Sequence, residues 1–141
     1  MTKSPEFHEM IVEVNIFDTD CYGVMWHGAY MKWLEIGRVK FMEMRGIRLS
    51  KPEEVGGHIY PVTEQHLNFL APARYQDVLR LNTSLQVKRY QLNFYQSFVN
   101  VSNDKITMEA ETKMVVLDMQ WKLQRNLPKH LIDSLKNNEV A

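Results

Sequence analysis

Residues 15–46 constrain the fold of this chain more than any other part of the sequence. The stretch opens with the acidic run Asp18-Thr19-Asp20, passes through Gly23, and continues as a proline-free segment that ends at Gly46. In that segment apolar residues recur at spacings of three and four, the pattern of a helix with a buried face. We therefore expect a strand, an acidic turn and then a long helix that begins near residues 26–28 and is closed by Gly46.

The apolar stripe of this helix predicts which of its faces is buried. Its members are Tyr30, Trp33, Leu34, Gly37, Phe41 and Met44. A glycine inside the stripe lowers helix propensity, and a close approach to a sheet would explain its presence. Further apolar residues lie off the stripe, namely Met31, Ile36, Val39 and Met42. A helix that is apolar on more than one side needs more than one neighbour, so we expect an oligomer.

Five segments of the sequence alternate apolar and polar residues and predict strands with one buried face. They are residues 8–17, 59–70, 78–87, 92–101 and 106–117. Residues 88–91 connect the third and fourth of these segments, and residues 102–105 form a turn before the last. A short helix is expected after Pro128. This order predicts an α+β protein, in which an antiparallel sheet has the long helix packed on one face.

Length and charge exclude several classes of protein. The 141 residues suit a single domain, whose core we place at residues 8–117 and whose tail we place at 118–141. Lys plus Arg and Asp plus Glu both total 17, and a neutral chain gives no electrostatic reason to expect nucleic acid or a membrane surface as partner. We expect a cytoplasmic protein, because Cys21 cannot form an internal disulfide and the N-terminus lacks a signal peptide's apolar run.

The acidic turn and the start of the helix contain the residues best suited to chemistry. Gly23 can adopt a positive φ or let another group come close. The first N–H groups of a helix have no intrahelical partner and carry partial positive charge, so they can polarise a carbonyl group. A carboxylate across a small gap from such donors suits acyl-group chemistry. An aspartate before a helix is also a common N-cap, and the residue types alone leave both readings open.

Two patterns in the sequence are found together in a known family. The first is D-x-D-x-x-G-V-x-x-x-x-x-Y, formed by Asp18, Asp20, Gly23, Val24 and Tyr30. The second is the Pro-x-x-x-x-Asp step at residues 72–77. Together they resemble the 4-hydroxybenzoyl-CoA thioesterase family over about residues 8–117. The resemblance implies the hot-dog fold, a five-stranded antiparallel sheet wrapped around one long central helix, assembled as a homo-dimer or homo-tetramer.

The resemblance also implies a reaction, the hydrolysis of a small acyl-CoA to free acid and coenzyme A without a cofactor. Asp20 stands at the position of the family's catalytic carboxylate, where it acts either as a nucleophile or as a general base on water. Asp18 and Gly23 would shape the turn. The backbone N–H of His27, and that of Gly28, would polarise the thioester oxygen. The His27 side chain would either orient the substrate or bond to a carbonyl of the turn.

Several further residues are candidates for binding or catalysis. Tyr30 matches the family's aromatic residue and is assigned to substrate binding, although its place on the apolar stripe favours the core. Lys88 and Arg89 lie where the family places cations for the nucleotide end of CoA, or they form an ordinary basic turn. Glu64 and His66 are interpreted as strand residues and Cys21 as a thiol without a base. The sequence has no metal-ligand spacing, so no metal is expected.

Three other functions are compatible with the sequence. One is a thioesterase for an aromatic substrate such as hydroxybenzoyl-CoA or 1,4-dihydroxy-2-naphthoyl-CoA. Another is a hot-dog hydratase or dehydratase that acts on acyl thioesters with a His–acid pair, for which Asp20 and His27 are the candidates. The last is a non-catalytic acyl-CoA-binding protein. The D-x-D-x-x-G-V turn favours the thioesterase.

Overall fold

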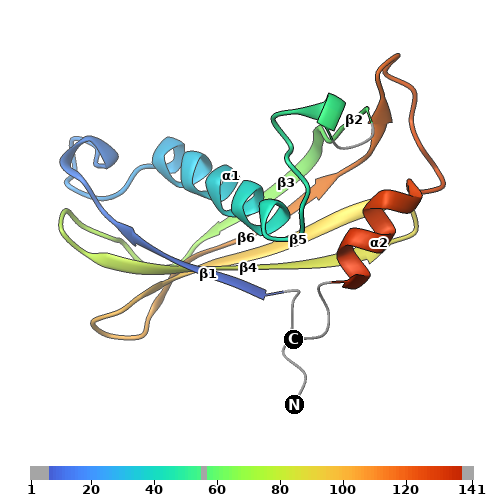
Figure 1. Cartoon of the computed structure of the whole chain (residues 1–141). Helices are drawn as coiled ribbons and strands as arrows, with labels where there is room; N and C mark the ends of the chain where they lie inside the picture. The colour runs from blue at the N-terminus through green and yellow to red at the C-terminus, as the bar shows by residue number, and fades with distance from the viewer. Residues whose placement is uncertain (1–6, 55–56, 138–141) are drawn as a thin grey trace.

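The computed structural model describes residues 7–54 and 57–137, and it shows a long helix lying across one face of a twisted sheet, with a short helix at one end (Figure 1). The elements in chain order are β1 (Phe7–Glu13), η1 (Ile16–Asp18), α1 (His27–Glu43), η2 (Pro52–Glu54), β2 (His58–Ile59), β3 (Val62–Phe69), β4 (Val78–Lys88), β5 (Gln91–Asn100), β6 (Ile106–Met114), β7 (Leu117–Asp118) and α2 (Lys129–Asn137). Among the described residues, none of the helices combines the length and the apolar character needed to cross a membrane.

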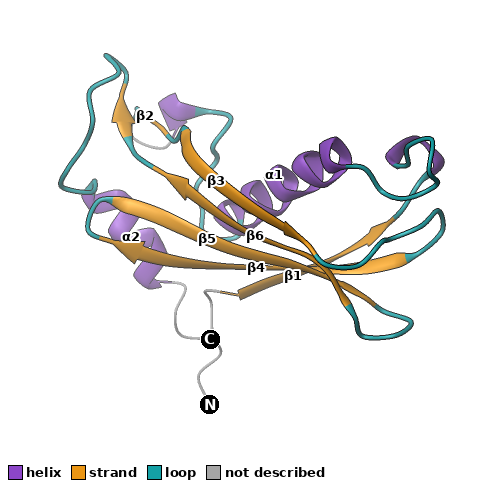
Figure 2. Cartoon of the chain, turned by 180° about the vertical axis from the view of Figure 1, so that it is seen from behind, coloured by secondary structure: helices purple, strands orange, loops and turns teal. Residues whose placement is uncertain are grey.

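The main sheet has five strands in the order β1-β4-β5-β6-β3, and all neighbouring pairs are antiparallel (Figure 2). In the hairpin between β4 and β5, Lys88 pairs with Gln91 and Arg89 has a φ of 57°. In the hairpin between β5 and β6, the Asn103 side chain accepts a hydrogen bond from the Lys105 N–H at 2.9 Å. Both predicted hairpins and the predicted order of helix and strands are confirmed.

The N-terminal half of α1 packs on the sheet through a single hydrophobic cluster. Leu34 of α1 and Leu79 and Leu81 of β4 are completely buried there. A Cβ atom at Gly37 would lie 2.8 Å from Gln96 Nε2 and 2.9 Å from Leu81 Cδ2. The glycine on the predicted stripe therefore permits the close approach of helix and sheet that was expected.

The C-terminal half of α1 has a second neighbour within the same chain. Phe41 and Met42 pack in a second buried cluster with Leu131 of α2, the short helix predicted after Pro128. Met42, predicted off the buried stripe, is only 1% exposed, whereas Met44, predicted on it, is 62% exposed. The stripe is wrong at this end because α1 ends at Glu43 and α2 covers the adjacent side. Part of the helix's apolar breadth is thus satisfied without an oligomer.

The first strand is shorter than predicted. It ends at Glu13, and residues 16–18 form the 3-10 turn η1 instead of continuing to residue 17 as strand. The cause is the Asp18 carboxylate, which accepts a hydrogen bond from the Asn15 N–H at 3.0 Å and folds the chain back. Ile16 and Phe17 therefore point outward, with 63% and 71% of their surface exposed.

The strands predicted at residues 59–70 and 106–117 are each interrupted. β3 pairs with β6 in the main sheet, whereas β2 pairs with β7 in a separate two-stranded sheet. Pro61 stands at the break between β2 and β3, where it offers no N–H to a ladder. Its carbonyl instead accepts a hydrogen bond from the Val115 N–H at 3.2 Å. The predicted connection at 47–58 contains η2, and residues 55–56 within it lie outside the described part of the chain.

Candidate active site

The two sequence patterns meet at one end of the sheet, beside the start of α1 (Figure 1). The Met25 N–H in the acidic turn donates to the Ala73 carbonyl in the 72–77 step at 2.7 Å. Asp77 fixes the shape of this step, because its carboxylate accepts a hydrogen bond from the Arg74 N–H at 2.8 Å. The turn and the step are far apart in sequence, yet this hydrogen bond holds them side by side.

Asp18 is the buried carboxylate of the turn. It is 1% exposed, and its two oxygens accept hydrogen bonds from the Asn15 N–H at 3.0 Å and the Lys32 ammonium at 3.3 Å. Its carbonyl accepts a hydrogen bond from the Trp26 N–H at 3.1 Å, which closes the turn. The buried Asp18 carboxylate and its carbonyl thus help to hold the turn in shape.

Asp20 is the exposed carboxylate of the same turn. Its Oδ1 atom accepts hydrogen bonds from the N–H groups of Tyr22 at 2.8 Å and Val24 at 3.4 Å. Among the described residues none donates to its other oxygen, Oδ2. Gly23 has a φ of 78° and open space where a Cβ would lie, so this glycine serves the backbone conformation of the turn. The turn therefore holds one carboxylate oxygen and presents the other to solvent.

The start of α1 supplies hydrogen-bond donors at the same end of the molecule. Trp26 is the N-cap, and its carbonyl accepts hydrogen bonds from the Ala29 N–H at 3.0 Å and the Tyr30 N–H at 3.2 Å. The N–H groups of His27 and Gly28 have no acceptor in residues 7–54 and 57–137. A helix start left open in this way can polarise a carbonyl oxygen.

The His27 side chain is exposed and lies with its ring edge-on to the Trp26 indole, with centroids 5.4 Å apart. Within the described residues, no hydrogen bond joins it to a carbonyl of the turn. The Trp26 ring also lies across Gly28, where a Cβ atom would come within 2.2 Å of it. Sequence reasoning gave Gly28 only an N–H group and missed this contact. The signal was a tryptophan two residues before a glycine at a helix start.

Tyr30 belongs both to the core and to the wall of a hollow. It is 2% exposed, and its hydroxyl donates to Thr107 Oγ1 at 3.1 Å. Burial raises the pKa of this hydroxyl, which keeps it protonated as a donor. Its ring lines a hollow of about 320 Å³ next to the turn, together with side chains that include Val24 and Phe69.

Lys88 and Arg89 are not brought to Asp20 within one chain. They lie at the hairpin that ends β4, whereas the start of β4 at Val78 adjoins the 72–77 step. β4 is 11 residues long, and a strand rises about 3.3 Å per residue, so roughly 30 Å separates the two places. The Lys88 ammonium lies 3.2 Å from the Tyr95 hydroxyl at that far end.

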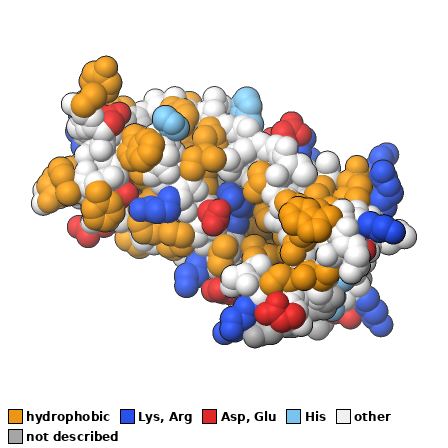
Figure 3. Space-filling view, turned by 90° about the horizontal axis from the view of Figure 1, so that it is seen from above, with side chains coloured by type: hydrophobic (Ala, Val, Ile, Leu, Met, Phe, Trp, Pro, Cys, Tyr) orange, Lys and Arg blue, Asp and Glu red, His pale blue; other side chains and the backbone are white. Residues whose placement is uncertain are grey.

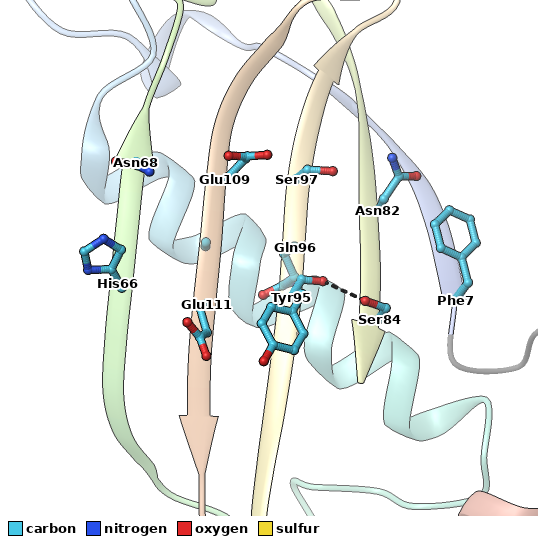
Figure 4. Close-up of a pocket in the computed structure, with 11 residues that line it drawn as sticks. Phe7, His66, Asn68, Asn82, Ser84, Tyr95, Gln96, Ser97, Glu109 and Glu111 are labelled. Atoms are coloured by element: carbon cyan, nitrogen blue, oxygen red, sulfur yellow. Dashed lines mark hydrogen bonds between the residues drawn. The ribbon is translucent and has the colours of Figure 1, made fainter. Parts of the chain in front are cut away.

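Glu64 and His66 lie outside the candidate site. Glu64 forms an ion pair with Lys113 at 3.6 Å, and its side chain is 68% exposed. His66 lines a hollow of about 490 Å³ on the sheet face turned away from α1, where it lies near Glu111 (Figure 4). No residue of the acidic turn lines that hollow, so we do not assign catalysis to it. Cys21 is an exposed free thiol.

Hydrophobic side chains gather at the end of the molecule where α1 begins, on the left of Figure 3. Large exposed residues of the turn, the end of β3 and the 72–77 step are Phe17, Tyr22, Trp26, Phe69, Leu70 and Tyr75. Contiguous exposed apolar surface of this kind usually marks a binding site or an interface.

Known proteins share this sequence pattern and this fold. The profile of the thioesterase-like superfamily matches residues 14–135. The acyl-CoA thioester hydrolase YbgC of Escherichia coli O157:H7 is 30% identical over 127 residues, which cover 89% of this chain and 92% of YbgC. The chloroplastic acyl-acyl carrier protein thioesterase ATL2 of Arabidopsis thaliana is 27% identical over 126 residues, 89% of this chain but only 66% of ATL2. The crystal structure of Slr0204, a 1,4-dihydroxy-2-naphthoyl-CoA thioesterase from Synechocystis, superposes with a TM-score of 0.82 at 18% identity, covering 93% of this chain and 96% of Slr0204.

Proposed function

Because this chain belongs to the thioesterase-like superfamily, we propose that it hydrolyses acyl-CoA thioesters with the Asp20 carboxylate and the open N–H groups at the start of α1. Its fold is the hot-dog fold of thioesterases, an antiparallel sheet with helices. The finer resemblance to the 4-hydroxybenzoyl-CoA thioesterase family supports Asp20 as the catalytic carboxylate. YbgC, named as an acyl-CoA thioester hydrolase, supports the reaction.

One observation supports the site above all others. The turn holds Oδ1 of Asp20 through the Tyr22 N–H at 2.8 Å and leaves Oδ2 without a donor among the described residues. At the same end of the sheet, the N–H groups of His27 and Gly28 are without an acceptor in the described part of the chain. A carboxylate oxygen and two preorganised donors are the groups needed on opposite sides of a thioester carbonyl.

The reaction balances by either of two routes. In the first, Oδ2 of Asp20 attacks the carbonyl carbon, the oxyanion is held by the His27 N–H, and coenzyme A leaves as thiolate. Water then hydrolyses the mixed anhydride, which releases the acid and restores the carboxylate. In the second, Asp20 takes a proton from a water molecule that attacks the carbonyl directly, and the proton passes to the departing thiolate. Both routes consume one water molecule and need no cofactor.

The arrangement of His27 favours hydrolysis over hydration of a double bond. A hydratase would use the His–acid pair that the sequence allowed for. Here the His27 ring contacts the Trp26 indole, and no carboxylate bonds to it within the described residues. The backbone N–H of His27 is thus better placed for catalysis than its side chain, and an N–H donor suits a thioester carbonyl.

We extend the proposal to a homo-dimer or homo-tetramer. Exposed apolar side chains such as Tyr22, at 82% exposed, and Phe69, at 55%, gather around the turn and would be covered by a second copy. The cations Lys88 and Arg89 lie at the opposite end of their own sheet, so the hairpin of a second copy would have to supply them to CoA phosphates. The expected location remains the cytoplasm.

The test is release of the coenzyme A thiol from a panel of thioesters by the purified chain. Saturable hydrolysis of acetyl-, hexanoyl- or benzoyl-CoA is the expected result. Tight binding without thiol release would identify a non-catalytic acyl-CoA-binding protein instead. Hydration of crotonyl-CoA with its thioester intact would identify the hydratase.

A further inference from the structure

The hollow beside the turn is lined mainly by apolar side chains. Val24 and Met25 of the turn form one wall, Tyr30 of α1 forms the floor, and residues 69–72 at the end of β3 form the other wall. Its volume is about 320 Å³, near the lower end of the roughly 300–1,000 Å³ found for ligand pockets. Such a space suits a small ligand group.

This hollow adjoins the proposed catalytic carboxylate through the backbone of the turn. The Asp20 N–H donates to the Val24 carbonyl at 3.0 Å, and the Val24 N–H lies 3.4 Å from Asp20 Oδ1. Val24 also forms an isolated antiparallel β-bridge with Arg74, which comes two residues after the end of the second wall at residue 72. The segment that presents the carboxylate is therefore also one side of the hollow.

Several polar groups next to the hollow are already engaged with one another. The Tyr30 hydroxyl donates to Thr107 Oγ1 at 3.1 Å, and the Thr107 carbonyl accepts the N–H groups of Leu70 at 2.9 Å and Ala71 at 3.2 Å. These bonds leave the ring of Tyr30 in edge contact with that of Phe69, at 5.8 Å between centroids. No charged side chain is among the residues that line the hollow.

We propose that this hollow receives the acyl group, an assignment that rests on the proposed hydrolysis at Asp20, and that it selects small uncharged hydrocarbon groups whose length Phe69 and Ala71 limit. A carboxylate on the acyl group would lose water without gaining a partner there. A ring hydroxyl would meet the same lack of free donors, which disfavours hydroxybenzoyl and dihydroxynaphthoyl groups. Each additional methylene that still fits gains contact with apolar walls.

The first experiment compares acyl groups by their binding, so that it does not depend on turnover. Asp20→Asn, which keeps the shape of the turn, is titrated with hexanoyl-CoA and with succinyl-CoA in a calorimeter. Hexanoyl-CoA should bind about tenfold or more tightly than succinyl-CoA, and benzoyl-CoA more tightly than 4-hydroxybenzoyl-CoA. Equal affinities within either pair would overturn the selectivity even if hydrolysis is confirmed. Absence of hydrolysis by the unmodified chain would instead refute the proposed function.

The second experiment fills the hollow. Ala71→Leu places a larger side chain in its wall and should lower kcat/KM for hexanoyl-CoA by about tenfold while changing that for acetyl-CoA by less than about twofold. Ser97→Leu is the matched control, because Ser97 lines the hollow on the opposite face of the sheet, and it should leave both values unchanged. Equal losses on the two substrates with Ala71→Leu would place the acyl group elsewhere.

The complementary change enlarges the hollow. Phe69→Ala should shift the preferred acyl length upward, so that kcat/KM for dodecanoyl-CoA relative to hexanoyl-CoA rises about fivefold or more. Ile11→Ala removes a side chain of similar exposure, 59% against 55%, from the other edge strand and should not shift the preference. An unchanged length preference in a folded Phe69→Ala variant would contradict the role of Phe69.

Discussion

The two ends of α1 are built for opposite purposes. At its start, the turn leaves a carboxylate exposed, two N–H groups without an acceptor among the described residues, and Tyr22 82% exposed. At its other end, Phe41 is completely buried against Phe94, with ring centroids 5.5 Å apart, and Leu131 of α2 closes the cluster. One helix thus connects an end whose polar groups are exposed to an end whose apolar side chains stabilise the fold.

The polar groups at the two ends of α1 also differ, in whether they have hydrogen-bond partners. In the turn, backbone N–H groups hold Asp18 and Asp20, so the local conformation is fixed by hydrogen bonds. At the packed end, His58 Nδ1, His130 Nε2 and the Tyr60 hydroxyl are buried without a hydrogen-bond partner among the described residues. Burial raises the pKa of Tyr60 to about 12. Hydrophobic packing must offset the cost of these groups, so this end should be sensitive to losing any of its apolar contacts.

Leu131→Ala should have the largest effect and should act on stability alone. Leu131 is 0% exposed in the cluster with Phe41 and Met42. Removing a side chain of this kind costs about 2–5 kcal/mol of unfolding free energy, because it leaves a cavity. Urea denaturation measures the loss, and kcat per folded molecule should not change. The control Leu123→Ala, at a residue 36% exposed, should cost much less. A fall in kcat that matches the stability loss would show that the two ends are coupled.

Asp20→Asn should show the converse, a loss of turnover with stability retained. The change keeps the shape of the side chain and removes the group that acts at the barrier, so kcat should fall about a hundredfold or more, which is about 2.7 kcal/mol. Asp18→Asn is the matched control two residues away. It should lower stability by about 1–2 kcal/mol, because the buried carboxylate bonds to Asn15 and Lys32, and it should change kcat only slightly. Hydrolysis by folded Asp20→Asn at the unmodified rate would refute the catalytic assignment.

The features of the fold that could be predicted from the sequence are those that depend on local sequence patterns. The alternation of Leu79 and Leu81 with polar neighbours is enough to define β4, since each side chain's face follows from its position. The positive φ of Gly23 could be predicted because the need for a glycine at such a position is set by the local backbone. The residue at which β1 ends could not be predicted. It depends on the Asp18 carboxylate, which turns back to the Asn15 N–H instead of to solvent.

The sequence predicted which residues would make up the candidate site, but not how they are arranged. The resemblance indicated that the turn and the 72–77 step belong together, and the Met25–Ala73 hydrogen bond shows how they meet. The positions of Lys88 and Arg89 relative to Asp20 depend on which end of β4 adjoins the step, which is a property of the whole sheet. The burial of Met42 under α2 likewise depends on a helix distant in sequence.

A smaller effect is expected from the hairpin that carries Lys88 and Arg89. Changing these residues tests whether the hairpin end of β4 takes part in substrate binding. Lys88→Gln combined with Arg89→Asn removes both charges, and Asn tolerates the φ of 57° at position 89. Exposed ionic contacts are worth about 0.2–1 kcal/mol each, so KM for an acyl-CoA should rise about three- to tenfold with little change in kcat. A truncated acyl-pantetheine substrate, which lacks the nucleotide, serves as the control and should be unaffected. Equal losses on both substrates would contradict the assignment.

The smallest effect is expected from pH, and it should arise at the packed end. Burial, and then the neighbouring His130, lower the pKa of His58 below its usual 6.5, and Asp118 acts in the opposite direction. The His58 and His130 rings lie 5.3 Å apart. Below pH 6.5 the unfolded chain therefore takes up a proton at His58 more readily than the folded chain does. This contribution to stability is complete above pH 6.5 and declines as the pH falls from there towards the folded pKa.

His130→Gln removes one of the two causes that lower the pKa of His58, so it should flatten the decline in stability between pH 7 and pH 5. The difference should be less than about 1 kcal/mol, measured by urea denaturation at each pH. Some slope should persist, because burial and the nearby Arg45 and Lys40 also lower the pKa of His8. His27→Gln is the control from the other end of α1, where the side chain is exposed, and it should leave the slope as it is. If His27→Gln flattened the slope and His130→Gln did not, the pH-sensitive packing would lie at the turn, and the division of α1 into a reactive end and a stabilising end would fail.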